Sequence, residues 1–484
     1  MSSTSPHGCS DEPGGSWGNA PPARLLVLTA GPPPAPGGHE GCAYQYRSEV
    51  RRLSLAAVAG ATLRDMRSAL GSRTGRATQL VLAGQMIQAV MGFGLNVLLL
   101  RALSLDDYGL FSLFNSAMML LAGFIHLGWP ETFVRFGAKH RDEAVFAALR
   151  ARFFRRTLLS AGLLAAGAAL LAPWVAESIY GRPDFARYLR AAALGAWLTC
   201  LFMFVQNDYR VRQRYPAFLA QQIGSAALRL ALCTGAFLAG TLTLWAAAWV
   251  YALAPLLFVA WSALGGSTRE TLNAPAKVGP HLEAETRTYN RWLVVAMIPF
   301  TFGGQINYHI IAHFHGNADL SSFGAAGRLT LPIDFAITAL TTTLLPRLSA
   351  AKGVHEIRHY LSRLKLFLIP FAMGTVAFCW LAPPLLIWIA GGKYAGIGPL
   401  VQLLIVNALV ILLANPVDLV LNAWGWTRGL AILSLAKLLV GVVLGLWWIP
   451  RWGTMGAITA SLAVNVMELV VVYAALWSGL RKRQ

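Results

Sequence analysis

The chain has 484 residues, of which 56% are hydrophobic and 13% are charged. Soluble domains carry about 25% charged residues, so this composition excludes an ordinary soluble domain. Lys and Arg number 40 against 21 Asp and Glu, a net charge of +19. Because that excess lies mostly in short loops between apolar stretches, we interpret it as a membrane-orientation signal and exclude nucleic-acid binding.

The first 65 residues differ in composition from the rest of the chain. Gly, Pro and Ser dominate residues 1–41, and the apolar run Leu25–Leu28 is far too short to span a membrane. We expect residues 1–65 to be disordered and not to form a cleavable signal peptide. A start of the native chain at Met66 stays open as a hypothesis.

From residue 79 onward the chain repeats apolar stretches of about 20 residues, the length that a helix needs to cross a bilayer. The prediction is an all-α integral membrane protein with twelve transmembrane helices. The least regular stretch is 380–398, which Pro and Gly interrupt. The predicted spans are 79–100, 110–128, 157–175, 188–206, 218–239, 244–264, 292–312, 322–345, 364–382, 399–420, 429–448 and 455–477.

The loops between these stretches alternate between rich and poor in Lys and Arg. The rich set (129–156, 207–217, 265–291, 346–365 and 421–428) holds 20 of these residues, and the poor set holds six. Cytoplasmic loops carry the excess, so both termini are predicted to be cytoplasmic. The poor set is Arg101, Arg182, Arg187, Arg190, Lys393 and Arg451.

Short matches at a shift of about 210 residues indicate an internal repeat. Leu171-Ala172-Pro173 matches 381–383, Asp208 matches Asp418, and Arg229 corresponds to Lys437 at a shift of 208. We therefore predict two six-helix lobes, 66–264 and 292–484, joined by a cytoplasmic linker at 265–291. Such parallel repeats are related by a pseudo-two-fold axis along the membrane normal, and transporters built this way place substrate between the lobes. A structural duplication without transport is the alternative.

Polar residues three or four apart form stripes on several predicted helices. A single stripe more often serves helix–helix hydrogen bonding, but six stripes over both halves favour a hydrated cavity. Ionisable groups at membrane depth are costly and normally face protein or water, although ion pairing and snorkelling are alternatives. The predicted cavity residues are Gln85, Gln88, Asn96, His126, Arg229, Gln305, His309, His313, Arg328 and Lys437.

Two acids on the same kind of stripe, Asp334 and Glu468, are candidates for proton coupling. His309 and His313 could relay protons because imidazole titrates near physiological pH. The competing interpretation is that both acids only neutralise nearby cations. Without a third convergent ligand the His pair predicts no metal site. No catalytic signature, cofactor motif or disulfide framework is present, so we predict neither an enzyme nor a cofactor.

Several segments resemble the bacterial polysaccharide-export flippases, a family of the superfamily that includes multidrug and toxin extruders. The resemblance covers about 78–480 and rests on 98–104 (LLLRALS), 107–112 (DYGLFS), 323–329 (FGAAGRL) with 345–349 (LPRLS), 392–395 (GKYA) and 416–425.

This resemblance implies twelve helices in two lobes around a V-shaped cavity. It also implies a flippase that moves a polyprenyl-diphosphate-linked oligosaccharide across the bacterial cytoplasmic membrane for surface or exopolysaccharide synthesis. Membrane lipids, a polysaccharide polymerase and export machinery would be the partners. A cation-coupled multidrug exporter and a non-transporting membrane scaffold are the alternatives.

Overall fold

The computed structural model describes residues 73–140, 142–264, 278–338, 341, 354–424 and 426–482. The expectations for residues 1–65 and for the loop segments 265–277 and 346–353 lie outside these ranges. Within them the regular structure is entirely helical. The elements are α2 (Arg73–Ala102), α3 (Leu105–Ile125), α4 (Trp129–Lys139), α5 (Glu143–Ser178), η1 (Pro183–Phe185), α6 (Ala186–Val211), α7 (Tyr215–Leu238), α8 (Leu244–Leu264), α10 (Pro280–Phe314), α11 (Asn317–Gly327), η2 (Arg328–Thr330), α13 (Val354–Ala390), η3 (Gly392–Tyr394), α14 (Gly398–Ala423) and α15 (Thr427–Lys482).

Eight helices of the described residues are long and apolar enough to cross a membrane. They are α2, α3, α5, η1 with α6, α8, α13, α14 and α15, and they contain nine of the predicted spans because α15 holds two. Gly453 lies between those two, with a non-helical φ of 56° and ψ of −134° that breaks the helix. A multi-pass membrane protein is therefore shown, whereas the count of twelve stays a prediction.

The other three predicted spans lie in more polar helices. The stretch 218–239 falls in α7, and 292–312 falls in α10. Gln221, Gln222 and Arg229 interrupt the first, and Gln305, Asn307 and His309 interrupt the second. The stretch 322–345 begins in α11 and η2 and runs past the described residues.

Short polar residues begin two of the helices. The Ser104 hydroxyl accepts a hydrogen bond of 3.0 Å from the backbone N–H of Asp107 at the start of α3. Asp142 caps α5 in the same way, accepting from Ala144 N–H at 2.9 Å. Such caps satisfy N–H groups that have no partner within the helix, which explains why these helices begin where they do.

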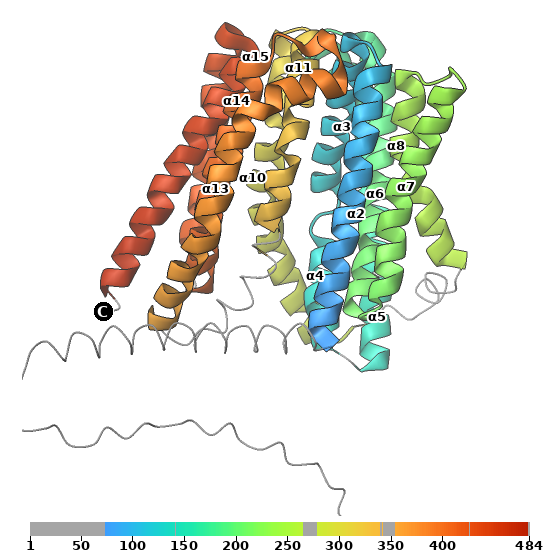
Figure 1. Ribbon diagram of the computed structural model, residues 1–484. Helices are drawn as coiled ribbons and strands as arrows, with labels where there is room; N and C mark the ends of the chain where they lie inside the picture. The colour runs from blue at the N-terminus through green and yellow to red at the C-terminus, as the bar shows by residue number, and fades with distance from the viewer. Residues whose placement is uncertain are drawn as a thin grey trace, which may run out of the picture. The chain divides into compact units, whose positions relative to one another are not determined.

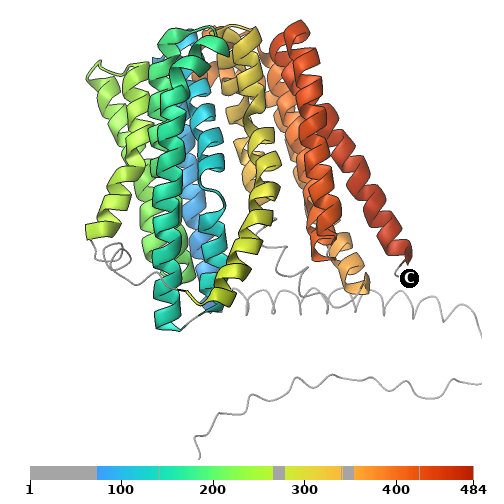
Figure 2. The ribbon, with the colours of Figure 1, turned by 180° about the vertical axis from the view of Figure 1, so that it is seen from behind.

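The helices form two groups, α2–α8 and α13–α15, with α10 between them (Figures 1 and 2). In the first group α6 packs against α3, α5 and α8, and in the second α14 packs against α13 and α15. α10 contacts both α3 and α15. The groups lie closest near α11 and diverge toward the end at which the chain terminates.

At the end opposite α11, the first turns of α10 are attached to the first group. These turns, residues 280–291, fall within the predicted linker 265–291. Thr132 of α4 donates to the Asn290 Oδ1 atom at 2.7 Å, and the Asn290 amide donates to the Leu127 carbonyl at 3.0 Å. Arg135 lies 4.3 Å from the centre of the Tyr289 ring. This part of the predicted linker is therefore a helical extension of α10.

At the α11 end, cations of one group donate hydrogen bonds to the backbone of the other. Arg101 donates to the carbonyls of Ile389 (2.6 Å) and Trp388 (3.0 Å), and Lys393 donates to the Leu103 carbonyl (2.7 Å). Both cations belong to the Arg- and Lys-poor loop set. Arg101 of α2 bonds to the end of α13, and Lys393 of η3 bonds to the residue that follows α2 by one position. We call these two residues the outer clasp, because their bonds join the end of α2 to η3 and the end of α13.

Candidate functional site

The first candidate site surrounds Arg229, which lies in the middle of α7. Its guanidinium carbon is 5.3 Å from the centre of the Tyr251 ring on α8. Phe111 packs edge-on against the same ring, with 4.9 Å between centroids, so the aromatic face is held in place. A guanidinium over a tyrosine ring is stabilised by about 0.5–2 kcal/mol, depending on how far water is excluded.

Arg328 approaches the same tyrosine from the second half of the chain. It follows the last residue of α11 and begins η2. Its guanidinium lies within electrostatic range of three hydroxyls, those of Tyr108 on α3, Tyr251 on α8 and Tyr308 on α10. Tyr308 is itself packed edge-on against Phe323 at 4.9 Å. The fold thus brings two predicted cavity cations, 99 residues apart in the sequence, to one tyrosine, and we name Arg229, Arg328, Tyr108, Tyr251 and Tyr308 the arginine–tyrosine cluster.

Neither arginine of this cluster pairs with a carboxylate among the described residues. The Nε atoms of Arg229 and Arg328 are inaccessible to solvent and have no hydrogen-bond partner. Guanidinium groups cannot lose their charge at physiological pH. Within the part of the chain that the structure describes, two positive charges therefore have no counter-charge at this point, an arrangement suited to an anionic ligand.

The third predicted cation, Lys437 of α15, lies in a different environment. Its ammonium group forms an ion pair and hydrogen bond with Glu468, further along the same helix and beyond the Gly453 break. Asp418 of α14 is close enough to interact with both charges, and its Oδ1 atom is inaccessible and has no hydrogen-bond partner. We name Lys437, Glu468 and Asp418 the lysine–acid cluster. It contains two acids and one cation.

Amide and hydroxyl pairs connect the helices around this second cluster. Asn465 of α15 donates to Asn407 of α14 at 2.8 Å, and Asn307 of α10 donates to Ser461 of α15 at 2.8 Å. These four polar side chains therefore serve helix–helix contacts, which was the alternative interpretation of each polar stripe.

The two predicted cavity histidines on α10 contact the end of α5. A ring nitrogen of His309 lies 2.6 Å from the Tyr180 hydroxyl, and its other nitrogen lies 3.4 Å from the Ser116 hydroxyl. His313 is hydrogen-bonded to the Ile179 carbonyl. Both therefore join α10 to the first group of helices at the α11 end. Throughout the described part of the chain, no three His, Cys, Asp or Glu residues gather as a metal site would need.

The remaining predicted residues lie apart from both clusters. Asn96 donates to the Gly92 carbonyl of its own helix at 2.7 Å, and its Oδ1 atom is buried without a partner. The His126 Nδ1 atom accepts from Gly128 N–H at 2.8 Å in the turn between α3 and α4. Asp334 is exposed and accepts from Thr330 at 3.3 Å. Gln85, Gln88 and Gln305 are half-buried on α2 and α10.

Sequence reasoning missed the three tyrosines of the arginine–tyrosine cluster. Tyr251 lies in the most apolar part of 244–264, where no polar periodicity marks it. Its only signal was a hydroxyl at membrane depth, and a buried tyrosine hydroxyl usually needs a partner. Asp418 was recognised as a repeat match and a stripe member, but its proximity to Lys437 was not.

Long apolar helices, arranged in two groups with charged residues at membrane depth, define a multi-pass membrane protein. Residues 75–352, more than half of the chain, match the family described as "Polysaccharide biosynthesis protein". The chain belongs to this family. No curated protein sequence matches it significantly.

Solved structures with the same fold are membrane transporters. A lipid II flippase, MurJ, in an inward closed conformation superimposes with a TM-score of 0.66 and 12% identity, covering 81% of this chain and 86% of MurJ. A multidrug-resistance MATE transporter of the MOP superfamily, inward-facing, has a TM-score of 0.65 and 15% identity, covering 82% and 95%. An outward-facing MATE structure has a TM-score of 0.56 and 14% identity, covering 84% and 96%. These structures share the fold of this chain, and the expected polysaccharide-related family is confirmed by the match over residues 75–352.

Proposed function

We propose that this protein is a flippase that moves a polyprenyl-diphosphate-linked oligosaccharide from the cytoplasmic to the outer leaflet of the bacterial inner membrane. One observation carries the proposal. Arg229 and Arg328, contributed by different halves of the chain, meet at Tyr251 without a carboxylate among the described residues. A transporter of neutral or cationic compounds gains nothing from two uncompensated guanidinium groups at this depth.

The chemistry of such a substrate matches what the residues offer. Arginine recognises phosphate oxygens through two parallel N–H donors, and these charge-assisted hydrogen bonds are strong where water is scarce. The half-buried amides of Gln85, Gln88 and Gln305 are suited to sugar hydroxyls. The lipid tail can stay in the bilayer while the polar head crosses. Lys437 is already paired with Glu468, so we assign the diphosphate to Arg229 and Arg328.

Alternating access between two lobes, 66–264 and 292–484, completes the proposed mechanism. Loop charges favour a cytoplasmic position for both termini and for the N-terminal ends of α5 and α10. The outer clasp of Arg101 and Lys393 would then close the outer side. The higher TM-score to the inward-facing than to the outward-facing MATE structure agrees with a cytoplasm-accessible state.

A second candidate function is cation-coupled export, favoured by the lysine–acid cluster. Asp418 and Glu468 together exceed the single charge of Lys437, which leaves one acid available to a proton or sodium ion. This cluster could also serve a flippase, as the coupling site of the same cycle.

Accumulation of lipid-linked oligosaccharide in a deletion strain separates the two functions. We expect the lipid-linked sugar to accumulate when the gene is deleted, and wild-type protein to relieve the accumulation. Unchanged lipid-linked sugar together with increased sensitivity to cationic drugs would instead identify an exporter. No change in either would leave only the scaffold interpretation.

A further inference from the structure

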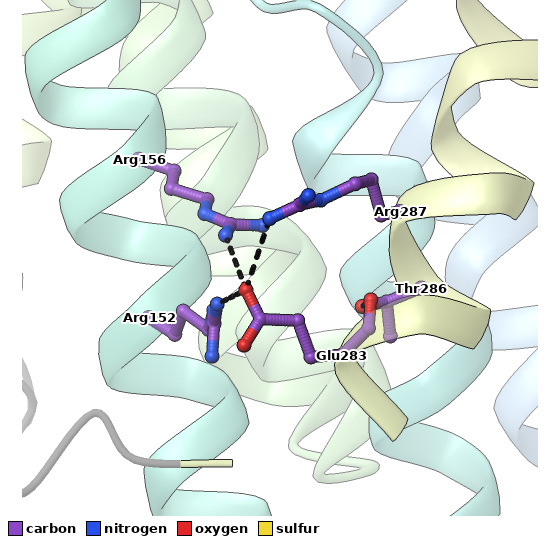
Figure 3. A network of polar contacts seen from close by, with 5 residues as sticks. All are labelled: Arg152, Arg156, Glu283, Thr286 and Arg287. Atoms are coloured by element: carbon purple, nitrogen blue, oxygen red, sulfur yellow. Dashed lines mark hydrogen bonds and ion pairs between the residues drawn. The ribbon is translucent and has the colours of Figure 1, made fainter. Parts of the chain in front are cut away.

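A second group of arginines lies at the end of α5 that is predicted to be cytoplasmic, away from both clusters. Arg152 and Arg156 of α5 and Arg287 of α10 all point at one carboxylate oxygen, Oε1 of Glu283 (Figure 3). The oxygen is 3.4 Å from Arg156 and 3.4 Å from Arg287, and Arg152 contacts it as well. We name these four residues the Glu283 group.

The charges of the Glu283 group do not balance. Three guanidinium groups against one carboxylate leave a net charge of +2. A carboxylate in the usual fork geometry accepts two parallel hydrogen bonds from a single arginine, so three arginines on one oxygen compete for it. Arg156 is further held 4.9 Å from the centre of the Trp129 ring. Each of the three arginines shares the single Glu283 oxygen, and the described residues supply no second carboxylate to the group, which is an anion-binding arrangement.

Three residues of the group, Arg152, Arg156 and Glu283, line a cavity of about 640 Å³, which is large enough for a lipid headgroup. Arg155, Ser160 and Val278 complete the wall together with Leu159. Leu159 is 69% exposed, and Leu163, one turn further along α5, is 79% exposed. Apolar side chains this exposed on a membrane-spanning helix face the acyl chains of the bilayer. A positive cavity thus adjoins a lipid-facing apolar stripe.

We propose that this cavity binds the phosphate of an anionic phospholipid headgroup from the surrounding bilayer, with an acyl chain lying along Leu159 and Leu163. Basic pockets between transmembrane helices on the cytoplasmic side bind such headgroups through the same charge-assisted hydrogen bonds. The exposed leucines favour a lipid over a free phosphate ion. The site is distinct from the arginine–tyrosine cluster, and the proposal does not depend on which substrate is transported.

A bound headgroup would strengthen one particular helix contact. Arg152 and Arg156 belong to α5, whereas Glu283 and Arg287 belong to the start of α10. Within the group, the contact between α5 and α10 is made by Glu283, which accepts from the two α5 arginines. A phosphate bound between the arginines would add further acceptors. Anionic lipid is therefore expected to stabilise the α5–α10 contact.

Lipid binding to the full-length purified protein tests the proposal. Native mass spectrometry during titration with phosphatidylglycerol, and separately with phosphatidylcholine, gives an apparent Kd for each lipid. We expect wild-type protein to prefer phosphatidylglycerol, and Arg152→Gln with Arg156→Gln to weaken that binding about tenfold or more. Arg190→Gln with Arg214→Gln removes the same charge from exposed positions elsewhere and should leave the preference unchanged.

Glu283→Gln gives an effect of opposite sign. It removes the only carboxylate of the group, so phosphatidylglycerol should bind more tightly than to wild type. Equal loss of binding in the two double variants, or weaker binding in Glu283→Gln, overturns the site. Inorganic phosphate at the lipid's concentration should not displace phosphatidylglycerol, and displacement would show that the ligand is a soluble anion instead.

Discussion

Arg229 and Lys437 occupy corresponding positions of the predicted internal repeat, 208 residues apart, yet their surroundings differ. Arg229 lies against Tyr251 and shares it with Arg328, without a carboxylate among the described residues. Lys437 is paired with Glu468. The comparison shows that a repeated cation need not keep one role. In the first half it is available to an anionic ligand, and in the second half it contributes to a helix-to-helix ion pair.

The acids of the repeat show the reverse pattern. Asp208 is buried between Arg150 at 2.8 Å and Arg212 at 3.2 Å, so its charge is compensated. Its counterpart Asp418, 210 residues later, forms no ion pair with any of the described residues. The first half thus has a free cation and a paired acid, and the second has a paired cation and a free acid. We propose that this asymmetry separates substrate binding from coupling.

The largest effect is expected when the two cations without a carboxylate partner, Arg229 and Arg328, are neutralised. Arg229→Gln with Arg328→Gln should slow flipping about 100-fold, because each lost charge-assisted hydrogen bond costs about 1.5–3 kcal/mol. Accumulated lipid-linked oligosaccharide in the complemented deletion strain measures this. Protein level should stay near wild type, since no carboxylate is left unpaired. Arg190→Gln is the matched control, and normal export by the double variant would show that the two arginines are structural.

Replacing the paired cation, Lys437, should lower the stability of the protein rather than its transport rate. Lys437→Gln leaves the half-buried Glu468 without its partner and should lower the free energy of unfolding by about 1–3 kcal/mol, between the values for exposed and for buried pairs. Thermal unfolding in detergent gives the shift. Lys437→Gln with Glu468→Gln restores a neutral pair and should recover most of the loss. If the double variant is no more stable than the single one, Lys437 and Glu468 are not coupled.

A charge-conserving change sharpens the contrast further. Arg229→Lys keeps the charge but loses the planar group that stacks on Tyr251 and donates two parallel hydrogen bonds. We expect flipping to fall about tenfold, between wild type and the double Gln variant. The corresponding Lys437→Arg should have little effect on flipping. Equal effects at both positions would remove the functional difference between the halves.

The smallest effects are expected at the candidate coupling residues in the absence of a proton gradient. Asp334 is exposed and contacts only the Thr330 hydroxyl among the described residues, so Asp334→Asn should change the flipping rate in liposomes about twofold or less. Asp418→Asn should abolish any response to an imposed pH gradient. If the flipping rate is changed neither by an imposed pH gradient nor by Asp418→Asn, Asp334→Asn or Glu468→Gln, proton coupling through these acids is excluded.

The sequence alone determined the class of protein and most helix positions. Apolar length decides which segments can span a bilayer, and this property is local, so α5 and α14 contain their predicted spans and α3 contains 110–125 of the predicted 110–128. Boundaries were less accurate where helices extend beyond the apolar segment. α5 begins 14 residues before the predicted 157, because Asp142 caps it in water, where hydropathy carries no information.

Only the tertiary structure decided which charges are paired. Stripe analysis placed Arg229, Arg328 and Lys437 together as cavity cations because each lies at depth on a polar face. Whether a cation meets a tyrosine or a glutamate depends on how neighbouring helices are rotated and how closely they pack. Tyr251 sits on α8, and Glu468 lies 31 residues from Lys437 across the Gly453 break. Partners that are decided by packing between distant helices leave no periodicity in the sequence. The sequence therefore showed Arg229 and Lys437 as equivalent cations, and only the structure showed their different partners.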